Sequence, residues 1–537
     1  MQFGSVPVDE AEGAILAHAV RAGERLFKKG RVLSASDLRA LAGAGVTDVV
    51  VARLEADDIS EDEAAARLAA ACGGDGAKVA APFTGRANLY AETDGLAMVA
   101  RARVDAFNLI DEAITLATIA PFSRVTARQM LATVKVIPFA APRNAVEEAE
   151  RLLAEGPAIS VAPFTPKRVA LISTRLPGTK PAILDKNRTA LDVRLVPLGS
   201  AIVFERRVAH EASALAVAIT EAHAAGCNPI LVFGASAITD RRDVIPAAIG
   251  QAGGTVSQFG MPVDPGNLLL LGSLDDAIMI GLPGCARSPK LNGFDHVLWR
   301  VLAGVPLARP DIAAMGVGGL LSEIPTRPQP RDERPAEPPR APKIGAIILA
   351  AGLSSRMGTN KLLADVGGKP MIRHVAEAAC ASYADPVIVV TGHDAPKVRA
   401  TLNGLNVEFV NNPNFTEGLS GSLRSGLSAL PEDSDGAMIL LGDMPAIDTT
   451  LIDRLIAAFD PGEQRAICLA TRHGKRGNPV LWARRFFPEI LAIEGDVGAR
   501  NLIGTYSELV CEIEASNAAP LTDIDTPEAL AAYRSRG

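Results

Sequence analysis

The segment that most constrains the fold of this chain is a proline-rich tract at residues 322–343, SEIPTRPQPRDERPAEPPRAPK. Prolines alternate there with charged residues, and no apolar period is present. A segment of this composition cannot build a hydrophobic core and is expected to form an extended, semi-rigid linker. The tract therefore predicts a long N-terminal part and a C-terminal part of ordinary single-domain size.

Length and charge narrow the class of protein. The chain has 537 residues, and at one domain per 100–200 residues it should hold about three domains. Aromatic residues make up 4% and charged residues 21%, which is ordinary for a soluble α/β protein. The net charge of −7 argues against a nucleic-acid-binding protein, which normally carries a basic excess.

The cysteines and the first residues point to the cytoplasm. No CxxC spacing for zinc or thiol exchange is present, so the thiols indicate a reducing compartment. The N-terminus has no basic segment followed by an apolar core, and no apolar run is long enough to span a membrane. We expect neither export nor membrane insertion. The six cysteines are Cys72, Cys227, Cys285, Cys380, Cys468 and Cys511.

Behind the tract, residues 344–537 alternate short apolar runs with helical periods. This succession predicts an α/β domain with a doubly wound, mostly parallel sheet, in which ligands bind at the carboxyl ends of the strands. One helix starts with Pro370 in its first turn. The expected strands are 345–351, 386–392, 407–412 and 437–443, and the expected helices are 369–382, 395–402, 422–430 and 450–459.

Residues 166–321 follow the same alternation and predict a second α/β domain. Its expected strands are 168–175, 229–234 and 277–284, and its helices 211–226 and 241–253. Residues 1–165 mix short strands and helices, so we expect a mixed α+β region there without deriving its fold.

The stretch LAAGLSSRMGTNK places a glycine and hydroxyl loop behind a strand. Gly352 permits close backbone approach, and the loop can aim backbone N–H groups at an anion. Arg356 and Lys361 add charge that can neutralise a triphosphate. The spacing fits neither GxxxxGK[ST] nor GxGxxG. The alternative is an ordinary turn with surface cations.

Two carboxylates complete a set suited to nucleoside triphosphates. Asp443 follows the apolar strand of LLGDMPAID, and Asp525 precedes a helix opened by Thr526 and Pro527. Together they can bind one Mg²⁺, which takes a few carboxylates plus water and phosphate oxygens. A turn or helix-cap role is the alternative for each, and we assign that role to Asp523.

Six motifs in order resemble the molybdenum cofactor nucleotidyltransferases, most closely the cytidylyltransferase branch. They are LAAGLSSRMGTNK, NPNFTEGLSGSLRSGL, LLGDMP, RGNPVLW, GDVGARNLI and DIDTP, which span essentially residues 344–537. The resemblance implies a Rossmann-like nucleotidyltransferase in which the terminal phosphate of molybdopterin attacks the α-phosphate of CTP and releases pyrophosphate. Positioning and charge neutralisation supply most of the catalysis in such a reaction.

The resemblance also implies roles for individual residues. Mg²⁺ on Asp443 and Asp525 would bridge the phosphates, while Arg356 and Lys361 stabilise the departing pyrophosphate. In this family an Ala-Ala-Gly entry to the loop accompanies CTP, and Ala-Gly-Gly accompanies GTP. A methyl at Ala351 would narrow the base slot against a purine. The implied nucleotide-binding loop residues are Leu349, Ala350, Ala351, Gly352, Ser354 and Ser355.

Two further segments are assigned by the same resemblance. Gly421 and Ser422 would line the cytosine, with a helix N-cap at Ser420 or Ser422 as the alternative. Polar residues of RGNPVL and GDVGAR would grip the pterin, and without the family they are ordinary loop residues. These are Asn478, Asp496 and Arg500.

The N-terminal part resembles the molybdopterin-binding fold of molybdopterin adenylyltransferases and molybdenum-insertion proteins. The resemblance rests on TGRANLYAETDGLAMVA, QMLATVKVIPFA, VFGASAITDRRDVIPAAI, GMPVDPGNLLLLGSL and IGLPGCARSP. It implies that two glycine turns hold the pterin phosphate. Arg175 replaces an acidic group of the relatives, and GASAITDRRD lacks their Gly-Gly-Val-Ser form, so we expect pterin binding and leave adenylyl transfer or metal insertion by this part open. The implied residues are Gly234, Ala235, Ser236, Asp240, Asp243, Pro283 and Gly284.

The expected protein is thus a cytoplasmic fusion of a pterin-binding module with a Mg²⁺-dependent transferase that uses CTP and molybdopterin. Its product would serve a molybdoenzyme of the xanthine dehydrogenase or aldehyde oxidoreductase type, or its chaperone. Guanylyl transfer, cytidylyl transfer to methylerythritol phosphate, and a non-catalytic carrier of the cofactor remain alternatives. A serine hydrolase is rejected as an alternative, because neither GLSSR nor GLSGS is a GxSxG elbow before a helix.

Overall fold

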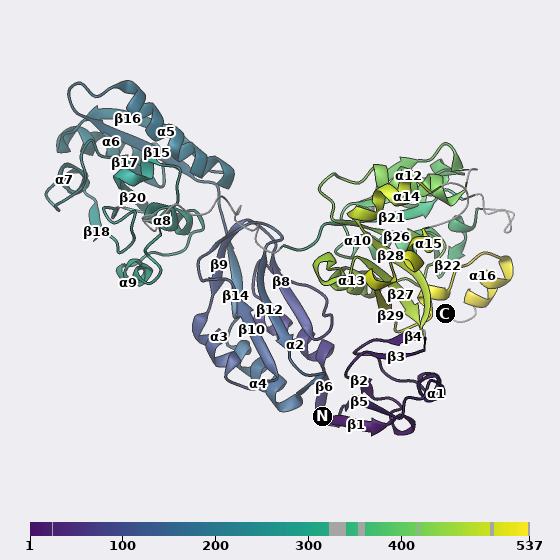
Figure 1. The fold of residues 1–537 in the computed structure, drawn as a ribbon. Helices are drawn as coiled ribbons and strands as arrows, with labels where there is room; N and C mark the ends of the chain where they lie inside the picture. The colour runs from purple at the N-terminus through teal and green to yellow at the C-terminus, as the bar shows by residue number, and fades with distance from the viewer. Residues whose placement is uncertain (24, 322–339, 353–359, 416–417, 494–498, 535–537) are drawn as a thin grey trace.

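The computed structural model describes residues 1–537 except 24, 322–339, 353–359, 416–417, 494–498 and 535–537. We name its four parts the N-terminal unit (1–53), the second unit (58–163), the third unit (164–321) and the C-terminal unit (340–534). Each has buried hydrophobic clusters of its own. In Figure 1 the third unit lies at one end and the C-terminal unit at the other, with the second unit between them.

The N-terminal unit is a three-stranded sheet of order β1-β5-β2 with one helix. Its helix begins behind Ser34, whose hydroxyl accepts from the Asp37 N–H while the Asp37 carboxylate accepts from the Ser34 N–H. This reciprocal cap satisfies two helix-end donors. The elements are β1 (Gln2–Pro7), β2 (Ile15–Leu16), β3 (Val20–Ala22), β4 (Arg25–Phe27), α1 (Ala35–Gly43) and β5 (Asp48–Arg53).

The second unit packs helices against an antiparallel sheet of order β10-β12-β8-β7, with a smaller sheet of order β11-β9-β14 beside it. Residues 1–165, for which the sequence suggested no fold, therefore contain two separate hydrophobic cores. The elements are β6 (Asp58–Ser60), α2 (Glu61–Cys72), β7 (Ala77–Val79), β8 (Arg86–Ala91), β9 (Gly95–Val99), α3 (Arg101–Asn108), β10 (Ile114–Thr118), β11 (Arg124–Val125), β12 (Met130–Val136), β13 (Ala140–Pro142), α4 (Arg143–Ala154) and β14 (Ile159–Pro163).

The third unit contains a six-stranded sheet of order β16-β15-β17-β20-β19-β18. The first four strands are parallel, and β19 and β18 continue the sheet antiparallel. The elements are β15 (Arg168–Arg175), α5 (Pro181–Leu195), β16 (Ala201–Ala209), α6 (Ala212–Ala224), β17 (Ile230–Phe233), α7 (Val244–Gln251), β18 (Thr255–Phe259), β19 (Leu270–Leu274), β20 (Ala277–Leu282), α8 (Gly293–Leu302) and α9 (Arg309–Ala313).

Strand β15 shows why the third unit has two helical layers. Leu171 belongs to the cluster that includes residues of α5 and α8, whereas Ile172 belongs to the cluster that includes residues of α6 and α7. Successive side chains of a strand point to opposite faces, so a continuous apolar run is buried on both. The carboxyl ends of β15, β16, β17 and β20 consequently meet at one edge of the sheet.

The C-terminal unit is a seven-stranded sheet of order β25-β24-β21-β26-β28-β27-β29. Strands β25, β24, β21 and β26 are parallel, while β28 runs antiparallel to both β26 and β27. The expected α/β class is correct, and the sheet is parallel on the side that carries β21. Its strands are β21 (Ile344–Ala350), β22 (Asp365–Val366), β23 (Lys369–Pro370), β24 (Val387–Thr391), β25 (Glu408–Asn411), β26 (Gly436–Leu441), β27 (Ile467–Arg472), β28 (Lys475–Ala483) and β29 (Val510–Glu514).

The helices of the C-terminal unit cover both faces of this sheet (Figure 1). The helix expected at 369–382 is shorter, because Pro370 is its N-cap residue and precedes its first turn. The helices are α10 (Met371–Cys380), α11 (Ala395–Thr401), α12 (Leu419–Ser428), α13 (Thr449–Ala458), α14 (Phe487–Leu491), α15 (Arg500–Thr505) and α16 (Pro527–Arg534).

The last residues of the proline-rich tract contact the second unit and the C-terminal unit. Arg340 forms a two-pronged ion pair with Asp435, at 2.7 and 3.0 Å, and a β-bridge with Gln129 of the second unit. The greater part of the expected linker, 322–339, lies outside the described residues.

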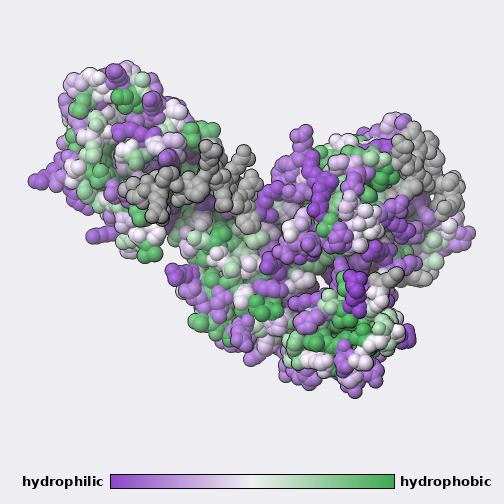
Figure 2. All heavy atoms as spheres, viewed as in Figure 1, coloured by the Kyte–Doolittle hydropathy of each residue, from purple (hydrophilic) through white to green (hydrophobic). Residues whose placement is uncertain are grey.

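Other contacts connect the N-terminal half of the chain to the C-terminal unit. Lys28 donates to the Val510 carbonyl at 2.7 Å, and the Tyr383 hydroxyl donates to the Val79 carbonyl. Figure 2 shows hydrophilic and hydrophobic residues interspersed over the visible face of the molecule. Among the described helices, none combines the length and the apolar character needed to cross a membrane.

Candidate active site

The nucleotide loop expected from the sequence leaves the carboxyl end of β21. Leu349 and Ala350 are the last residues of this strand and are buried. Ala351 follows, 3% exposed, and its carbonyl accepts from the His393 N–H at 3.3 Å. Gly352 is exposed. The predictions for Ser354, Ser355 and Arg356 fall outside the described residues.

Lys361 joins the two carboxylates expected to act with it. Its ammonium group forms an ion pair with Asp443 Oδ2 and another, at 2.5 Å, with Asp525 Oδ1. Lys361 opens a short 3-10 helix (Lys361–Leu363), which the Asn360 side chain caps by accepting from the Leu362 N–H at 3.1 Å. Three residues far apart in the chain thus meet at the carboxyl edge of the sheet.

A backbone hydrogen bond holds the C-terminal tail beside Asp443. The Ile524 N–H donates to the Asp443 carbonyl at 3.1 Å, and the buried Ile524 side chain packs with Met371 and Leu530. Asp525 is therefore positioned by its neighbour in the chain.

Of the turn or helix-cap role expected of Asp523, the helix cap belongs to a different residue. The Thr526 hydroxyl accepts from the Ala529 N–H at 3.2 Å in the first turn of α16. Asp523 is exposed. A threonine directly before the helical proline is closer to the first-turn donors than an aspartate three residues further back. Thr526 and not Asp523 therefore caps the helix.

The charges of this cluster favour a cation. Burial lowers the pKa of Lys361, but the charge of Asp443 and the hydrogen bonds to Asp443 and Asp525 outweigh it, so the pKa is raised. The second oxygen of Asp443, Oδ1, is buried and has no hydrogen-bond partner among the described residues. A buried carboxylate oxygen left unpaired beside a second carboxylate is a donor set that fits Mg²⁺.

The segment expected to contact the base lies in the first turns of α12. Gly418 is the N-cap residue of this helix, so the alternative cap role for Ser420 or Ser422 is wrong. The Ser422 hydroxyl, 5% exposed, accepts from the Asn412 side-chain amide at 3.1 Å. The Ser420 hydroxyl is buried and, within the described part of the chain, unpartnered.

Asn412 is a residue that the sequence reasoning missed. It directly follows β25, is 3% exposed, and its amide would stand 3.3 Å from a Cβ placed on Gly421. The available signal was the Asn pair that ends the VEFVNN strand, at the same sheet edge as Lys361.

The residues assigned to the pterin side occupy separate elements. Asn478 lies within β28 and is partly exposed, and Arg500 is the exposed first residue of α15. Asp496 falls outside the described residues. Their assignment to the pterin stays a prediction.

In the third unit, the two glycine turns expected to hold a phosphate lie close together. Gly234 follows β17, and Pro283 and Gly284 follow β20, the neighbouring strand. The exposed Arg287 donates to the Gly234 carbonyl at 2.9 Å, and its guanidinium would stand 3.6 Å from a Cβ on Gly284. The guanidinium also donates to the Asn187 side chain at 3.2 Å, and burial lowers its pKa, so Arg287 is exposed as a residue while its charged group is partly enclosed. This cation between the turns is a group that the sequence reasoning missed.

In the rest of the first glycine turn, the backbone N–H groups that could bind an anion already donate to a carboxylate of the same loop. The Asp243 carboxylate accepts from the backbone N–H groups of Thr239 and Asp240, at 2.6 and 2.9 Å. The Asp240 carboxylate pairs with Arg242 at 2.8 Å. The loop donors that would bind a phosphate next to Asp240 are thus already engaged.

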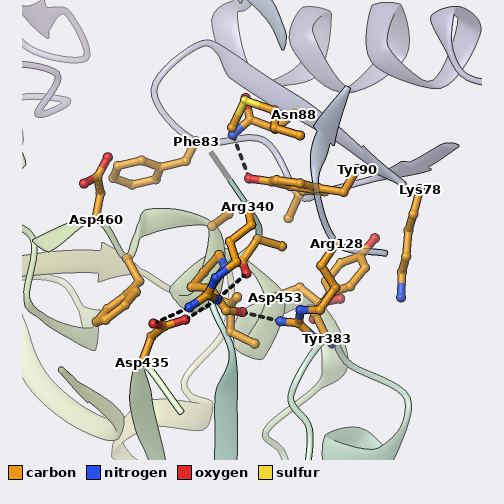
Figure 3. Close-up of a pocket in the computed structure, with 18 of the residues that line it drawn as sticks. Lys78, Phe83, Asn88, Tyr90, Arg128, Arg340, Tyr383, Asp435, Asp453 and Asp460 are labelled. Atoms are coloured by element: carbon orange, nitrogen blue, oxygen red, sulfur yellow. Dashed lines mark hydrogen bonds and ion pairs between the residues drawn. The ribbon is translucent and has the colours of Figure 1, made fainter. Parts of the chain in front are cut away.

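A cavity of about 1050 Å³ lies away from the candidate site, between the second unit and the C-terminal unit (Figure 3). Asp385, two residues before β24, and Asp435, directly before β26, line it, so the cavity lies at the amino edge of the strands. Lys361 and Asp443 lie at the opposite, carboxyl edge. Because ligands of such sheets bind at the carboxyl edge, we place the chemistry at Lys361 and not in this cavity.

Comparison with known proteins identifies part of the chain. Residues 346–510 match the family described as the MobA-like NTP transferase domain, and residues 5–53 match a domain of unknown function, DUF8806. The C-terminal region is accordingly a MobA-like nucleotidyltransferase domain.

Individual relatives match about a third of the chain. The nicotine blue oxidoreductase of Paenarthrobacter nicotinovorans is 26% identical over 193 residues, covering 35% of this chain and 94% of that protein. The purine catabolism protein PucB of Bacillus subtilis is 28% identical over 202 residues, covering 35% and 95%. A nucleotidyl transferase structure from Methanothermobacter thermautotroptrophicus is 25% identical, with a TM-score of 0.33, covering 36% of this chain and 97% of that chain.

The first prediction concerns competition between Lys361 and a divalent cation. Lys361→Met should raise the affinity of the nucleotide-free protein for Mn²⁺ at least about tenfold, because like charges a few ångströms apart repel by several kcal/mol. Titration of Mn²⁺ followed by electron paramagnetic resonance measures this. Lys369→Met, which removes an exposed partner of Glu377, is the matched control. An unchanged affinity in Lys361→Met would argue against a cation site at these carboxylates.

The second prediction concerns Asp453, which lines the cavity on α13. Burial raises its pKa to about 6, although a hydrogen bond from the Tyr383 N–H and the charge of Lys78 lower it. The folded state then binds the proton more tightly than the unfolded state, so stability falls as the pH rises from about 4 to about 6.

Asp453→Asn should remove this loss and stabilise the protein at pH 7.5 by about 1–2 kcal/mol, with a smaller gain at pH 5. Calorimetric unfolding midpoints at the two pH values measure it. Glu432→Gln, an exposed change in the same unit, should show no such pH-dependent gain. Equal gains at both pH values would contradict the raised pKa.

Proposed function

We propose that the C-terminal unit transfers CMP from CTP to the terminal phosphate of molybdopterin, while the third unit binds the pterin. The observation that carries this proposal is the Lys361 ammonium between Asp443 and Asp525 at the carboxyl edge of the sheet. The match to a MobA-like NTP transferase domain supports nucleotidyl transfer. The motif resemblance supports the choice of CTP and the pterin.

The proposed reaction exchanges one phosphoanhydride bond for another. A terminal phosphate oxygen of molybdopterin attacks the α-phosphorus of CTP, and the bond between the α- and β-phosphates breaks. The products are molybdopterin cytosine dinucleotide and pyrophosphate. Both reactants are anions, so positioning and charge neutralisation are the main contributions of the protein.

The residues of the site divide this work. Asp443 and Asp525 would hold Mg²⁺, which supplies charge neutralisation on the phosphates when bound. Lys361 lies where its ammonium group can leave the carboxylates and neutralise the pyrophosphate oxygens. Arg356 is assigned the same task by the motif resemblance.

The preference for CTP is assigned to Ala351. Its Cβ would stand 2.9 Å from a Cβ placed on Gly392, so the two residues lie against each other where β21 and β24 end. A methyl group at this position leaves less room at the sheet edge than a glycine. We propose that this difference favours a pyrimidine over a purine.

The pterin is assigned to two places. Asn478 and Arg500 would contact it during transfer in the C-terminal unit. Arg287, between the turns at Gly234 and Gly284, would bind its phosphate in the third unit, because a guanidinium beside backbone turns suits a phosphate. The dinucleotide would then pass to a molybdoenzyme or its chaperone.

The third prediction tests the proposed reaction directly. The full chain, Mg²⁺, molybdopterin and a mixture of CTP, GTP and ATP should yield the cytosine dinucleotide by mass, with release of pyrophosphate. Asp443→Asn should reduce the rate at least about 100-fold, because one carboxylate charge of the cation site is lost. Asp523→Asn, an exposed change close to Asp525 in the chain, should retain full activity. Absence of pyrophosphate release with every nucleotide would refute nucleotidyl transfer to this acceptor.

The fourth prediction tests the base preference. Ala351→Gly should lower the ratio of kcat/KM for CTP to that for GTP about tenfold, since one methyl group in a pocket is worth about 1–3 kcal/mol of discrimination. Steady-state pyrophosphate release with each nucleotide measures the ratio. If the ratio stays as in the unaltered protein, this methyl group does not select the base.

A further inference from the structure

The third unit contains a hydrogen-bonded chain of three side chains, of which the motif resemblance assigns a role only to Ser236, at the pterin phosphate. The His210 Nε2 atom lies 2.9 Å from the Ser236 hydroxyl, and its Nδ1 atom lies 2.8 Å from the Thr174 hydroxyl. A nucleophile within reach of a base, with the base held by a third group, is the arrangement that activates serine.

The three residues come together because their strands are neighbours. Thr174 is near the end of β15, His210 directly follows β16, and Ser236 follows β17 by three residues. These strands are parallel and adjacent in the sheet (Figure 1), so their carboxyl ends meet at the edge where ligands bind. Ser236 is exposed there, whereas Thr174 is 2% exposed.

The hydrogen bonds of Thr174 are compatible with a proton on His210 Nδ1, which is the tautomer that a general base at Nε2 requires. The Thr174 hydroxyl donates to the Phe233 carbonyl at 3.5 Å and accepts from the Ala235 N–H at 2.8 Å. Its remaining lone pair is then available to accept from the His210 Nδ1–H. In this tautomer His210 Nε2 carries a lone pair and accepts from the Ser236 hydroxyl, as a general base does.

The sequence around Ser236, which the rejection of a serine hydrolase above did not consider, shares part of a nucleophile turn, and the next helix begins only at Val244. Gly234-Ala235-Ser236 directly follows a buried strand and shares the first glycine and the serine of the GxSxG elbow. A Cβ on Gly234 would stand 2.6 Å from the Ser236 carbonyl oxygen, so this sharp turn requires glycine. Ile238 replaces the last glycine of the elbow and points toward Gly281, where a Cβ would stand 2.8 Å from its Cδ1.

Backbone donors are available beside the nucleophile. The N–H groups of Ser236 and Ala237 make no hydrogen bond within the described part of the structure. In elbow-type hydrolases the N–H of the residue after the serine stabilises the oxyanion, which is the position of Ala237 here.

We propose that Ser236, activated by His210, is the nucleophile of a second active site that hydrolyses small carboxylic esters. The Ser236 oxygen attacks the ester carbonyl carbon, and its proton passes to His210 Nε2. The carbon–oxygen ester bond then breaks, and the alcohol leaves with the proton from His210. Water, deprotonated by His210, releases the acid from Ser236, so that ester and water become acid and alcohol. Thr174 is a positioning residue.

The charges of the loop favour an uncharged carbonyl over a phosphate. The carboxylates of Asp240 and Asp243 lie in the same loop as Ser236, and Asp243 already accepts from the backbone N–H groups of Thr239 and Asp240. Asp240 is paired with Arg242, but a phosphate at Ser236 would still meet the Asp243 carboxylate without those donors, whereas an uncharged ester carbonyl needs only the oxyanion donor at Ala237. The pterin phosphate proposed above is assigned to Arg287 and not to this loop.

The test is labelling of the full chain by an uncharged fluorophosphonate probe, located by peptide mass spectrometry, together with hydrolysis of 4-nitrophenyl acetate. Ser236 should be modified, and hydrolysis should stop when it is. His210→Asn should slow both reactions at least about 100-fold, as loss of a general base does. The matched control His223→Asn, which removes an imidazole paired with Asp275 in the same unit, should change neither rate.

Thr174→Val should lower kcat for the ester about tenfold with little change in KM, and Thr174→Ser should restore it, because the hydroxyl orients the imidazole without contacting substrate. Absence of an adduct on Ser236 of the unaltered protein after prolonged exposure to excess probe would overturn the proposal. An adduct that forms equally fast in a folded His210→Asn variant would overturn it as well, since Ser236 would then react only because it is exposed. Neither outcome bears on nucleotidyl transfer in the C-terminal unit, so the two proposals fail separately.

Discussion

The ion pairs of Lys361 with Asp443 and Asp525 are the interaction on which the candidate site depends. They connect the loop after β21, the turn after β26 and the C-terminal tail. Two partly buried carboxylates repel each other unless a cation lies between them, and Lys361 supplies that charge in the nucleotide-free protein. Asp443 Oδ1 has no hydrogen-bond partner among the described residues, so this oxygen can contact a second cation. The same cluster can therefore exist without ligand, and its carboxylates are the donors that the proposed Mg²⁺ would use.

Both α/β units have parallel strands whose carboxyl ends lie at one edge of the sheet, but the side chains at that edge differ between the units. Parallel strands bring their carboxyl ends to one edge, so residues distant in sequence become neighbours. In the C-terminal unit this edge gathers carboxylates and a lysine, which suit a triphosphate. In the third unit it gathers Thr174, His210 and Ser236 on one side and Arg287 near the glycine turns on the other. Shared topology thus gives no guide to chemistry, which depends on the residues at each strand end.

Much of the fold was predictable because buried parallel strands are short apolar runs. The segments around 345–351 and 168–175 were recognised in this way and form β21 and β15. Strand β28, RGNPVLW within Lys475–Ala483, was not, because its first half is polar and its antiparallel place between β26 and β27 depends on long-range pairing. The two separate cores within residues 1–165 were missed for a similar reason, since short strands carry little periodic signal.

The sequence by itself determined the class of the C-terminal unit and which side chains are suited to a triphosphate, because glycine turns, strand-end carboxylates and cations are local features. Only the tertiary structure decided their contacts: Lys361 between two carboxylates, Thr526 rather than Asp523 as the cap, and Asn412 against Ser422. It also placed His210 beside Ser236, and no sequence motif predicted this contact. Hydrogen bonds between distant residues follow from strand order and register, and these are set by the packing of the whole sheet and not by any one segment.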